Sequence, residues 1–169
     1  GEPSLLATPH PPSDPAIRPR LRVATLHCGG EPIGAIDKLE SLRPDLVLLQ
    51  EVPDEEDLTA LSTRLYGNDG GSVRTARCAI IGRGRLSISH DDPSTGSLVA
   101  TFEPAGSQEV IDVMNLNLPR TQTRQDLWRP ESWSDLTARR KANRRLLRGL
   151  LEMLPERIGT EHRFVGGHF

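Results

Sequence analysis

The pattern that most constrains the fold is a strand, a helix and a second strand in close succession, between residues 21 and 49. Leu21–Leu26 has the composition of a strand. The next segment carries an apolar stripe at helical spacing, made by Ile33, Ile36, Leu39 and Leu42. Leu46–Leu49 is a continuous apolar run, as in strands that are covered on both faces. Strands that are joined through a helix at this spacing are expected to be parallel.

The middle of the chain predicts one more helix and then a series of short strands. Acidic residues crowd Asp54–Asp57, where they favour a helix start, and Gly67 is a plausible helix end. Residues 68–72 are rich in glycine and predict a loop. The strand candidates that follow are Arg77–Ile81, Arg85–Ser89, Leu98–Glu103 and Val110–Leu118. Their short connections predict antiparallel neighbours.

The last third of the chain predicts a long loop, a helix and a strand. Residues 119–133 form an irregular insertion that holds both tryptophans. Ser132 and Asp135 match a loose capping box, which predicts a helix over residues 134–154 with leucines on its apolar face. Phe164–Phe169 predicts a final strand. This order of elements indicates an α/β fold in which a mixed β-sheet is flanked by helices.

Composition sets the domain boundaries and excludes some classes of protein. Residues 1–20 hold six prolines and few apolar residues, so we interpret them as a tail or linker and place one domain at residues 21–169. The net charge of -2 neither demands nor excludes a nucleic-acid partner. No apolar run has the length of a membrane span, and no signal peptide is visible. Cys28 and Cys78 are expected to be reduced, buried thiols.

Polar side chains follow several of the predicted strands. His27 comes after the first strand and Glu51 ends the second. Asn115 and Asn117 lie near the end of the strand that begins at Val110, and His168 follows the last apolar stretch. Sites in open α/β sheets form beyond the carboxyl ends of the strands. We therefore expect these side chains to converge from distant parts of the sequence.

Four segments resemble motifs of the endonuclease/exonuclease/phosphatase superfamily, which has the deoxyribonuclease I-like fold. Residues 44–52 (PDLVLLQEV) are similar to the second motif of that superfamily, in which the glutamate binds catalytic Mg²⁺ or Mn²⁺; here this residue is Glu51. Residues 22–27, 113–118 and 165–169 resemble three further motifs in the same order. The resemblance implies the N-terminal half of a four-layer α/β sandwich.

The resemblance implies a divalent-metal-dependent phosphoester hydrolase of nuclease or phosphatase type, with Glu51 as the metal ligand. It places His27, Asn117 and His168 at the phosphate, where the superfamily has Asn, His and Asp respectively. The residues that supply the superfamily's general base come later than Phe169. The substrate would be a phosphoester, and a nucleic acid is one candidate.

Alternative interpretations remain open at this stage. His27, Glu51 and His168 form either a remodelled two-histidine, one-carboxylate set, which suits Mn²⁺, Fe²⁺ or Zn²⁺ better than Mg²⁺, or a decayed site whose polar side chains face water. The decayed site is favoured, so the alternative function is a non-catalytic family member that acts as a binding module. An isolated half would also expose an apolar sheet face, to be covered by a missing C-terminal half or by a dimer partner.

One predicted helix carries a cluster of basic residues. The cluster consists of Arg139, Arg140, Lys141, Arg144, Arg145 and Arg148. It is either a contact surface for a phosphate backbone or the solvated face of an amphipathic helix, and the second interpretation is favoured. The two tryptophans, Trp128 and Trp133, either stack on a base or anchor the insertion to the core.

Overall fold

The computed structural model describes residues 20–29, 36–52, 54–92, 96–118, 130–152 and 162–168. The helices are α1 (Ile36–Leu42), α2 (Glu55–Tyr66) and α3 (Pro130–Glu152), with a short 3-10 turn at Gly67–Asp69. The strands are β1 (Val23–His27), β2 (Leu46–Gln50), β3 (Gly70–Arg74), β4 (Cys78–Asp92), β5 (Ser97–Pro104), β6 (Ile111–Asn117) and β7 (His162–His168).

The strands form one mixed sheet that doubles back on itself through β4. β1 is parallel to β2, as the sequence predicts, and β2 is antiparallel to Cys78–Gly82 of β4. The other edge of this part of β4 pairs with β3, while Gly84–Asp92 pairs with β5. β5 and β6 are antiparallel, and β6 and β7 are parallel. β4 therefore belongs to two layers: the first holds β1, β2 and β3, and the second holds β5, β6 and β7.

β4 changes layer at Gly84. This glycine has a φ of 145°, and a Cβ atom there would collide with the Glu103 carbonyl oxygen. Only glycine adopts this conformation without strain. The strand can therefore turn from the first layer into the second without a break in its hydrogen bonding.

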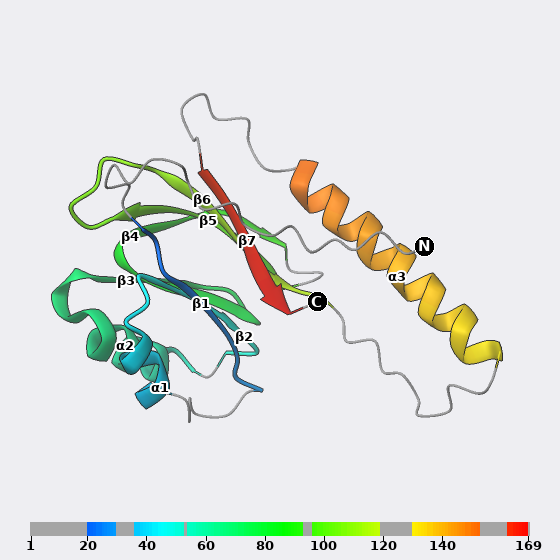
Figure 1. The fold of residues 1–169 in the computed structure, drawn as a ribbon, viewed down its shortest axis with the longest axis horizontal. Helices are drawn as coiled ribbons and strands as arrows, with labels where there is room; N and C mark the ends of the chain where they lie inside the picture. The colour runs from blue at the N-terminus through cyan, green and yellow to red at the C-terminus, as the bar shows by residue number, and fades with distance from the viewer. Residues whose placement is uncertain are drawn as a thin grey trace.

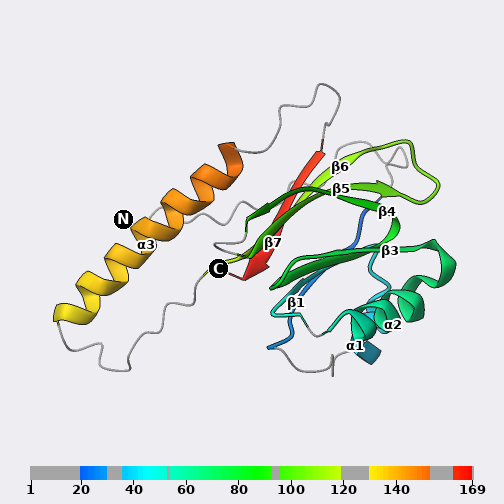
Figure 2. The same ribbon diagram turned by 180° about the vertical axis from the view of Figure 1, so that it is seen from behind.

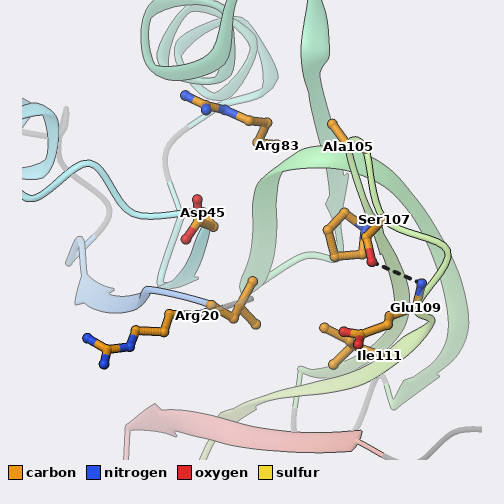
Figure 3. Close-up of a pocket in the computed structure, with 10 residues that line it drawn as sticks. Arg20, Asp45, Arg83, Ala105, Ser107, Glu109 and Ile111 are labelled. Carbon is orange, nitrogen blue, oxygen red and sulfur yellow. Dashed lines mark hydrogen bonds between the residues drawn. The ribbon is translucent and has the colours of Figure 1, made fainter. Parts of the chain in front are cut away.

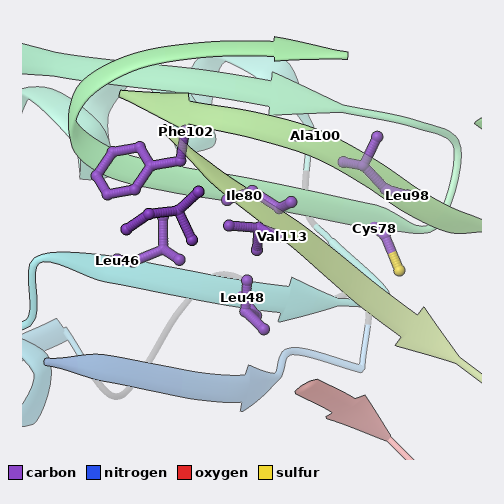
Figure 4. Packing of buried hydrophobic residues seen from close by; sticks show 9 residues of the cluster. Leu46, Leu48, Cys78, Ile80, Leu98, Ala100, Phe102 and Val113 are labelled. Atoms are coloured by element: carbon purple, nitrogen blue, oxygen red, sulfur yellow. The ribbon is translucent and has the colours of Figure 1, made fainter. Parts of the chain in front are cut away.

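The two layers face each other across a buried apolar core. Leu46, Leu48 and Ile80 from the first layer meet Phe102 and Val113 from the second (Figure 4), and none of these side chains is exposed to solvent. Strand periodicity explains this arrangement, because alternate residues of β2 point to opposite faces. The inward residues meet the second layer, and Val47 and Leu49 point outward.

Helices cover both outer faces of the doubled sheet (Figures 1 and 2). Leu39 of α1 and Leu58 and Leu61 of α2 pack on the outer face of the first layer. Leu146 and Leu147 of α3 pack on the outer face of the second layer. The expected α/β class, a mixed sheet with flanking helices, is confirmed.

Several local predictions are confirmed. Asp54 caps α2 by accepting a hydrogen bond from the Asp57 amide at 2.9 Å, and Gly67 ends the helix with a φ of 60°. Both cysteines are free thiols; Cys78 is buried as expected, whereas Cys28 is only half-buried. No helix in the described part of the chain is long and apolar enough to cross a membrane.

Other predictions are wrong. Arg77–Ile81 and Arg85–Ser89 are not separate strands but parts of β4, and the predicted loop at residues 68–72 is the 3-10 turn followed by β3. The expected exposure of an apolar sheet face is also wrong for the described residues, because the two layers bury their inner faces against each other. The physical reason is that β4 is long enough to serve both layers.

The boundary of the last helix also differs from the prediction. α3 begins at Pro130, so Trp133 lies inside the helix and Ser132 is not its cap. Proline suits the first helical turn because its missing N–H has no partner there in any case. Leu151, expected on the apolar face, is 43% exposed, and Leu146 packs on the sheet beside Leu147. Trp128 lies outside the described residues.

Candidate functional site

The carboxyl ends of four strands meet at one edge of the molecule. Three antiparallel pairings lead from β2 to β6, and β4 folds back between the two layers, so β1, β2, β6 and β7 all run in the same direction (Figure 4). His27 is aligned with Gln50 at the end of one parallel pair, and Asn117 with His168 at the end of the other. The fold thus brings the ends of these strands to the same side, as the sequence predicted.

The first two candidate residues are in direct contact. The His27 Nε2 atom lies 3.4 Å from Glu51 Oε2. The His27 side chain is 23% exposed and that of Glu51 is 43% exposed, so the pair sits at the surface with its carboxylate open to solvent. The carboxylate is therefore accessible to a ligand while one neighbouring imidazole can orient it.

The backbone of Glu51 has an unusual conformation. Its φ is 49°, in the left-handed region that non-glycine residues rarely adopt. Such a conformation costs stability and is common at ligand-binding and catalytic positions. The chain turns sharply after β2 at this residue, and the turn leaves the carboxylate beside His27 rather than in line with the strand.

A buried amide network lies directly behind this pair. Gln50 Nε2 donates to Asn115 Oδ1 at 2.7 Å and to Thr25 Oγ1 at 3.2 Å. Asn115 Nδ2 donates to the carbonyl oxygens of Leu49 and Ala79, each at 2.8 Å. The network joins β1, β2 and β4 to β6, so it fixes the two layers against each other just beneath the candidate site.

The sequence did not separate the roles of the two asparagines. Asn115 is fully buried and its amide is occupied by protein partners, so its role is structural. Asn117 is 5% exposed, and its backbone N–H donates to Ser97 Oγ at 3.4 Å. Both point toward the inner side of the second layer, because residues two apart share a strand face. Only the three-dimensional partners distinguish them.

His168 is placed by its backbone alone. It is the last residue of β7 and pairs in register with Asn117. Its side chain lies outside the described part of the structure.

The described side chains near Glu51 offer few metal ligands, but they are compatible with a hard cation. Among the residues that the structure describes, no group of three or more His, Cys, Asp and Glu side chains is close enough together to hold a metal. Mg²⁺ is commonly bound through one or two carboxylates, with water and phosphate oxygens completing its shell. A single accessible carboxylate, Glu51, fits that mode of binding.

The thiol next to the pair does not extend the site. Cys28 follows His27, and burial raises the pKa of its thiol to about 11. Metal ligation and nucleophilic attack both need the thiolate, which this pKa disfavours at neutral pH.

A pocket of about 220 Å³ lies at the opposite end of the strands (Figure 3). Its lining includes Arg20, Asp45, Arg83, Ser107 and Glu109. Asp45 precedes β2, whereas Glu51 follows it, so the pocket is separated from the candidate site by the length of that strand. The pocket is smaller than typical small-molecule sites, which span roughly 300–1,000 Å³.

The chain is similar in fold to solved structures of TDP2. No protein-family model and no curated protein sequence matches the chain. The structure of a D. rerio TDP2 humanized by 14 mutations is similar at 16% identity with a TM-score of 0.52, over 80% of this chain and 58% of that one. The structure of D. rerio TDP2 with a single-stranded DNA product is similar at 16% identity with a TM-score of 0.50, over 87% and 59%.

At 16% identity this likeness shows a shared α/β fold. The chain spans about three fifths of the length of these two structures.

Proposed function

We propose that this chain is part of a divalent-metal-dependent phosphoester hydrolase domain of nuclease or phosphatase type, and that Glu51 holds the cation. The observation that carries the proposal is the placement of Glu51. It stands at the carboxyl end of a central strand, in a left-handed conformation, with an accessible carboxylate 3.4 Å from His27. The phosphoesterase fold of the TDP2 structures supports the same chemistry.

The two residues of the contact have different roles in this proposal. Glu51 supplies oxygen ligands to Mg²⁺ or Mn²⁺, both of which prefer hard oxygen donors. When bound, the cation neutralises charge that develops on the phosphate oxygens. His27 orients the Glu51 carboxylate and, when protonated, adds positive charge beside the phosphate.

The remaining candidates line the phosphate position in this proposal. Asn117 and His168 end neighbouring parallel strands in register. Asn117 offers an amide donor to a phosphate oxygen, and His168 offers an imidazole that can form a hydrogen bond. A general base for the attacking water would come from residues beyond this segment, in line with the partial coverage of the TDP2 structures.

The substrate class is proposed to be a phosphoester, with nucleic acid as the leading candidate. One of the similar structures is a TDP2 complexed with a single-stranded DNA product. Among the described residues β1 and β7 stand at the two ends of the strand order. A C-terminal half or a second copy of the chain would pair with these edges, because exposed strand edges are liable to pair.

Metal binding tests the proposal without requiring the complete catalytic machinery. Mn²⁺ added to the chain is expected to lose part of its free-ion electron paramagnetic resonance signal, and Glu51→Gln is expected to weaken binding by about tenfold or more, which is about 1.4 kcal/mol. Asp45→Asn is the matched control at the other end of β2. Equal binding by the wild type and Glu51→Gln would sink the proposal.

Hydrolysis of a generic phosphodiester tests the next step. Activity of the full-length protein in the presence of Mg²⁺ or Mn²⁺ that is lost in Glu51→Gln and kept in Asp45→Asn supports an enzyme, and activity that survives in Glu51→Gln contradicts the role of Glu51.

A second candidate function is a non-catalytic binding module with the same fold. The observation that favours it is chemical: His27 and Asn117 stand where the superfamily has Asn and His, and no third metal ligand joins the contact between His27 and Glu51 among the described residues. Mn²⁺ binding that depends on Glu51, without hydrolysis of any phosphoester by the full-length protein, would support this function over the first.

A further inference from the structure

α3 carries a dense group of exposed cations, which we call the α3 basic face. It consists of Arg139, Arg140, Lys141, Arg144, Arg145 and Arg148. All of these side chains are exposed. No Asp or Glu occurs between residues 136 and 151, although the chain as a whole has a net charge of -2. Positive charge is thus concentrated on one element, as expected of a surface that attracts a polyanion.

The packing of α3 fixes the direction of this face. Leu146 and Leu147 contact the cluster formed by Val99, Met114 and Leu116 on the second layer. Each residue advances about 100° around an α-helix, so Lys141, Arg144, Arg145 and Arg148 fall on the side away from these leucines. Arg139 and Arg140 lie seven residues before Leu146 and Leu147, two turns earlier on the same side as the leucines, and are exposed there. Figures 1 and 2 show α3 lying along the outside of the sheet, with its far side uncovered by any other labelled element.

The spacing of the cations is unfavourable for the helix itself. Arg140 and Arg144, Arg144 and Arg148, and Lys141 and Arg145 are like-charge pairs four residues apart, an arrangement that destabilises a helix. No ion pair between described residues includes a member of the α3 basic face. Solvated helix faces usually mix charges of both signs. The absence of helical counter-ions therefore argues for an external anion and against a merely solvated face.

An aromatic side chain extends the same side of the helix. Trp133 is 57% exposed and lies eleven residues, or about three turns, before Arg144. α3 runs opposite to β7 (Figure 1), so its first turn is at the end of the molecule where β6 and β7 finish. An exposed tryptophan beside a row of cations is the combination used to stack a base while the phosphates are neutralised.

We propose that the α3 basic face and Trp133 bind a single-stranded nucleic acid, with the cations on its phosphates and the indole stacked on a base. A single strand is favoured over a duplex because stacking on an indole needs an unpaired base. A membrane surface is disfavoured because the apolar side of α3 already packs on the second layer and is not available to lipid. The proposal does not depend on Glu51 holding a metal.

Binding of a fluorescently labelled oligothymidylate, followed by anisotropy over a range of NaCl concentrations, tests the proposal. Each lost phosphate contact on a single strand reduces the slope of log K against log salt by about 0.7, so Arg140→Gln with Arg144→Gln should reduce it by about 1.4 and raise Kd roughly 25-fold at 0.1 M salt. Trp133→Ala should raise Kd about fivefold or more, and Trp133→Phe should restore most of the affinity.

Matched controls separate this site from general charge effects and from the proposed metal site. Arg43→Gln with Arg85→Gln removes the same charge from exposed positions on other elements and should leave Kd within about twofold. Removal of divalent cations with EDTA should leave the affinity of the α3 basic face for the oligonucleotide unchanged, because its contacts to the phosphates do not need a metal. The circular dichroism spectra of the α3 variants should match that of the wild type, because removing like charges does not weaken the helix.

Three outcomes would overturn the proposal. They are the absence of salt-dependent binding to the oligonucleotide, an equal loss of affinity in the Arg43 and Arg85 control, and tighter binding to vesicles rich in anionic lipid than to the oligonucleotide.

Discussion

The two ends of β2 carry acidic residues with contrasting surroundings. At the start of the strand, Asp45 Oδ2 accepts a hydrogen bond from the Arg22 amide at 2.8 Å and lies 3.8 Å from the Arg22 guanidinium. After the end of the strand, Glu51 has a left-handed backbone and an imidazole neighbour at 3.4 Å. One carboxylate ties the N-terminal segment to the sheet, and the other is held in a strained conformation facing solvent.

The contrast between Asp45 and Glu51 separates an acidic residue with a structural role from one with a proposed binding role. A carboxylate that accepts a backbone amide bond and faces a guanidinium stabilises the fold through those contacts. A carboxylate in a left-handed conformation lowers stability, so a compensating role in binding is expected.

The largest effect is expected from the amide network beneath Glu51. Asn115→Ala leaves the Leu49 and Ala79 carbonyl oxygens and the Gln50 amide without a shared partner. Each buried polar group left unsatisfied costs about 1–3 kcal/mol, so the free energy of unfolding should fall by at least about 3 kcal/mol. Denaturant titration measures this loss. Asn68→Ala, at an exposed position, should change stability by less than about 0.5 kcal/mol.

A smaller loss is expected at a third acid with a purely structural role. Asp54→Ala removes the hydrogen bond that caps α2 and should lower the free energy of unfolding by about 1 kcal/mol. Mn²⁺ affinity should stay as in the wild type. A drop in Mn²⁺ affinity equal to that of Glu51→Gln would contradict the claim that Asp54 is structural and that Glu51 holds the metal.

Replacing Glu51 by glycine should act in the opposite direction on stability. Glu51→Gly relieves the left-handed strain and should raise the free energy of unfolding by about 0.5–1 kcal/mol, while it removes the metal ligand. Arg43→Gly is a matched control, because Arg43 is also left-handed, with a φ of 46°. It should give a similar gain with unchanged Mn²⁺ binding. A lower free energy of unfolding in Glu51→Gly than in the wild type would contradict the argument that the Glu51 backbone is strained.

The smallest effect on stability near neutral pH is expected from ionisation of the two thiols. Burial raises the pKa of Cys78 to about 12 and that of Cys28 to about 11, from an ordinary value of 9.0. Because the fold favours the protonated thiols, their contribution to stability is complete below pH 9 and is lost as pH rises toward these values. Reaction with iodoacetamide at pH 8 should therefore be slow in the native state and fast after unfolding. Rapid native-state labelling of Cys78 would contradict its burial.

Local sequence patterns predicted the first half of the fold. The apolar run of β2, the helix on each side of it, and the parallel pairing with β1 all follow from spacing along the chain. Asp54 and Gly67 marked the ends of α2 because capping depends on neighbours in sequence.

The doubling of the sheet could not be predicted in the same way. Gly82, Arg83 and Gly84 look like a break between two strands, yet they form the middle of β4. Whether a glycine interrupts a strand or lets it bend depends on the layer that receives it, which is a tertiary property. The same holds for Asn115 and Asn117, which share a face of β6 and differ only in their partners.

The measurement that tests the central claim most directly is Mn²⁺ binding by the wild type, Glu51→Gln and Asp45→Asn under identical conditions. We predict that the wild type and Asp45→Asn bind the ion with similar affinity and that Glu51→Gln binds it at least about tenfold more weakly. Binding that survives in Glu51→Gln, or that is lost in Asp45→Asn instead, would contradict the assignment of Glu51 as the metal ligand.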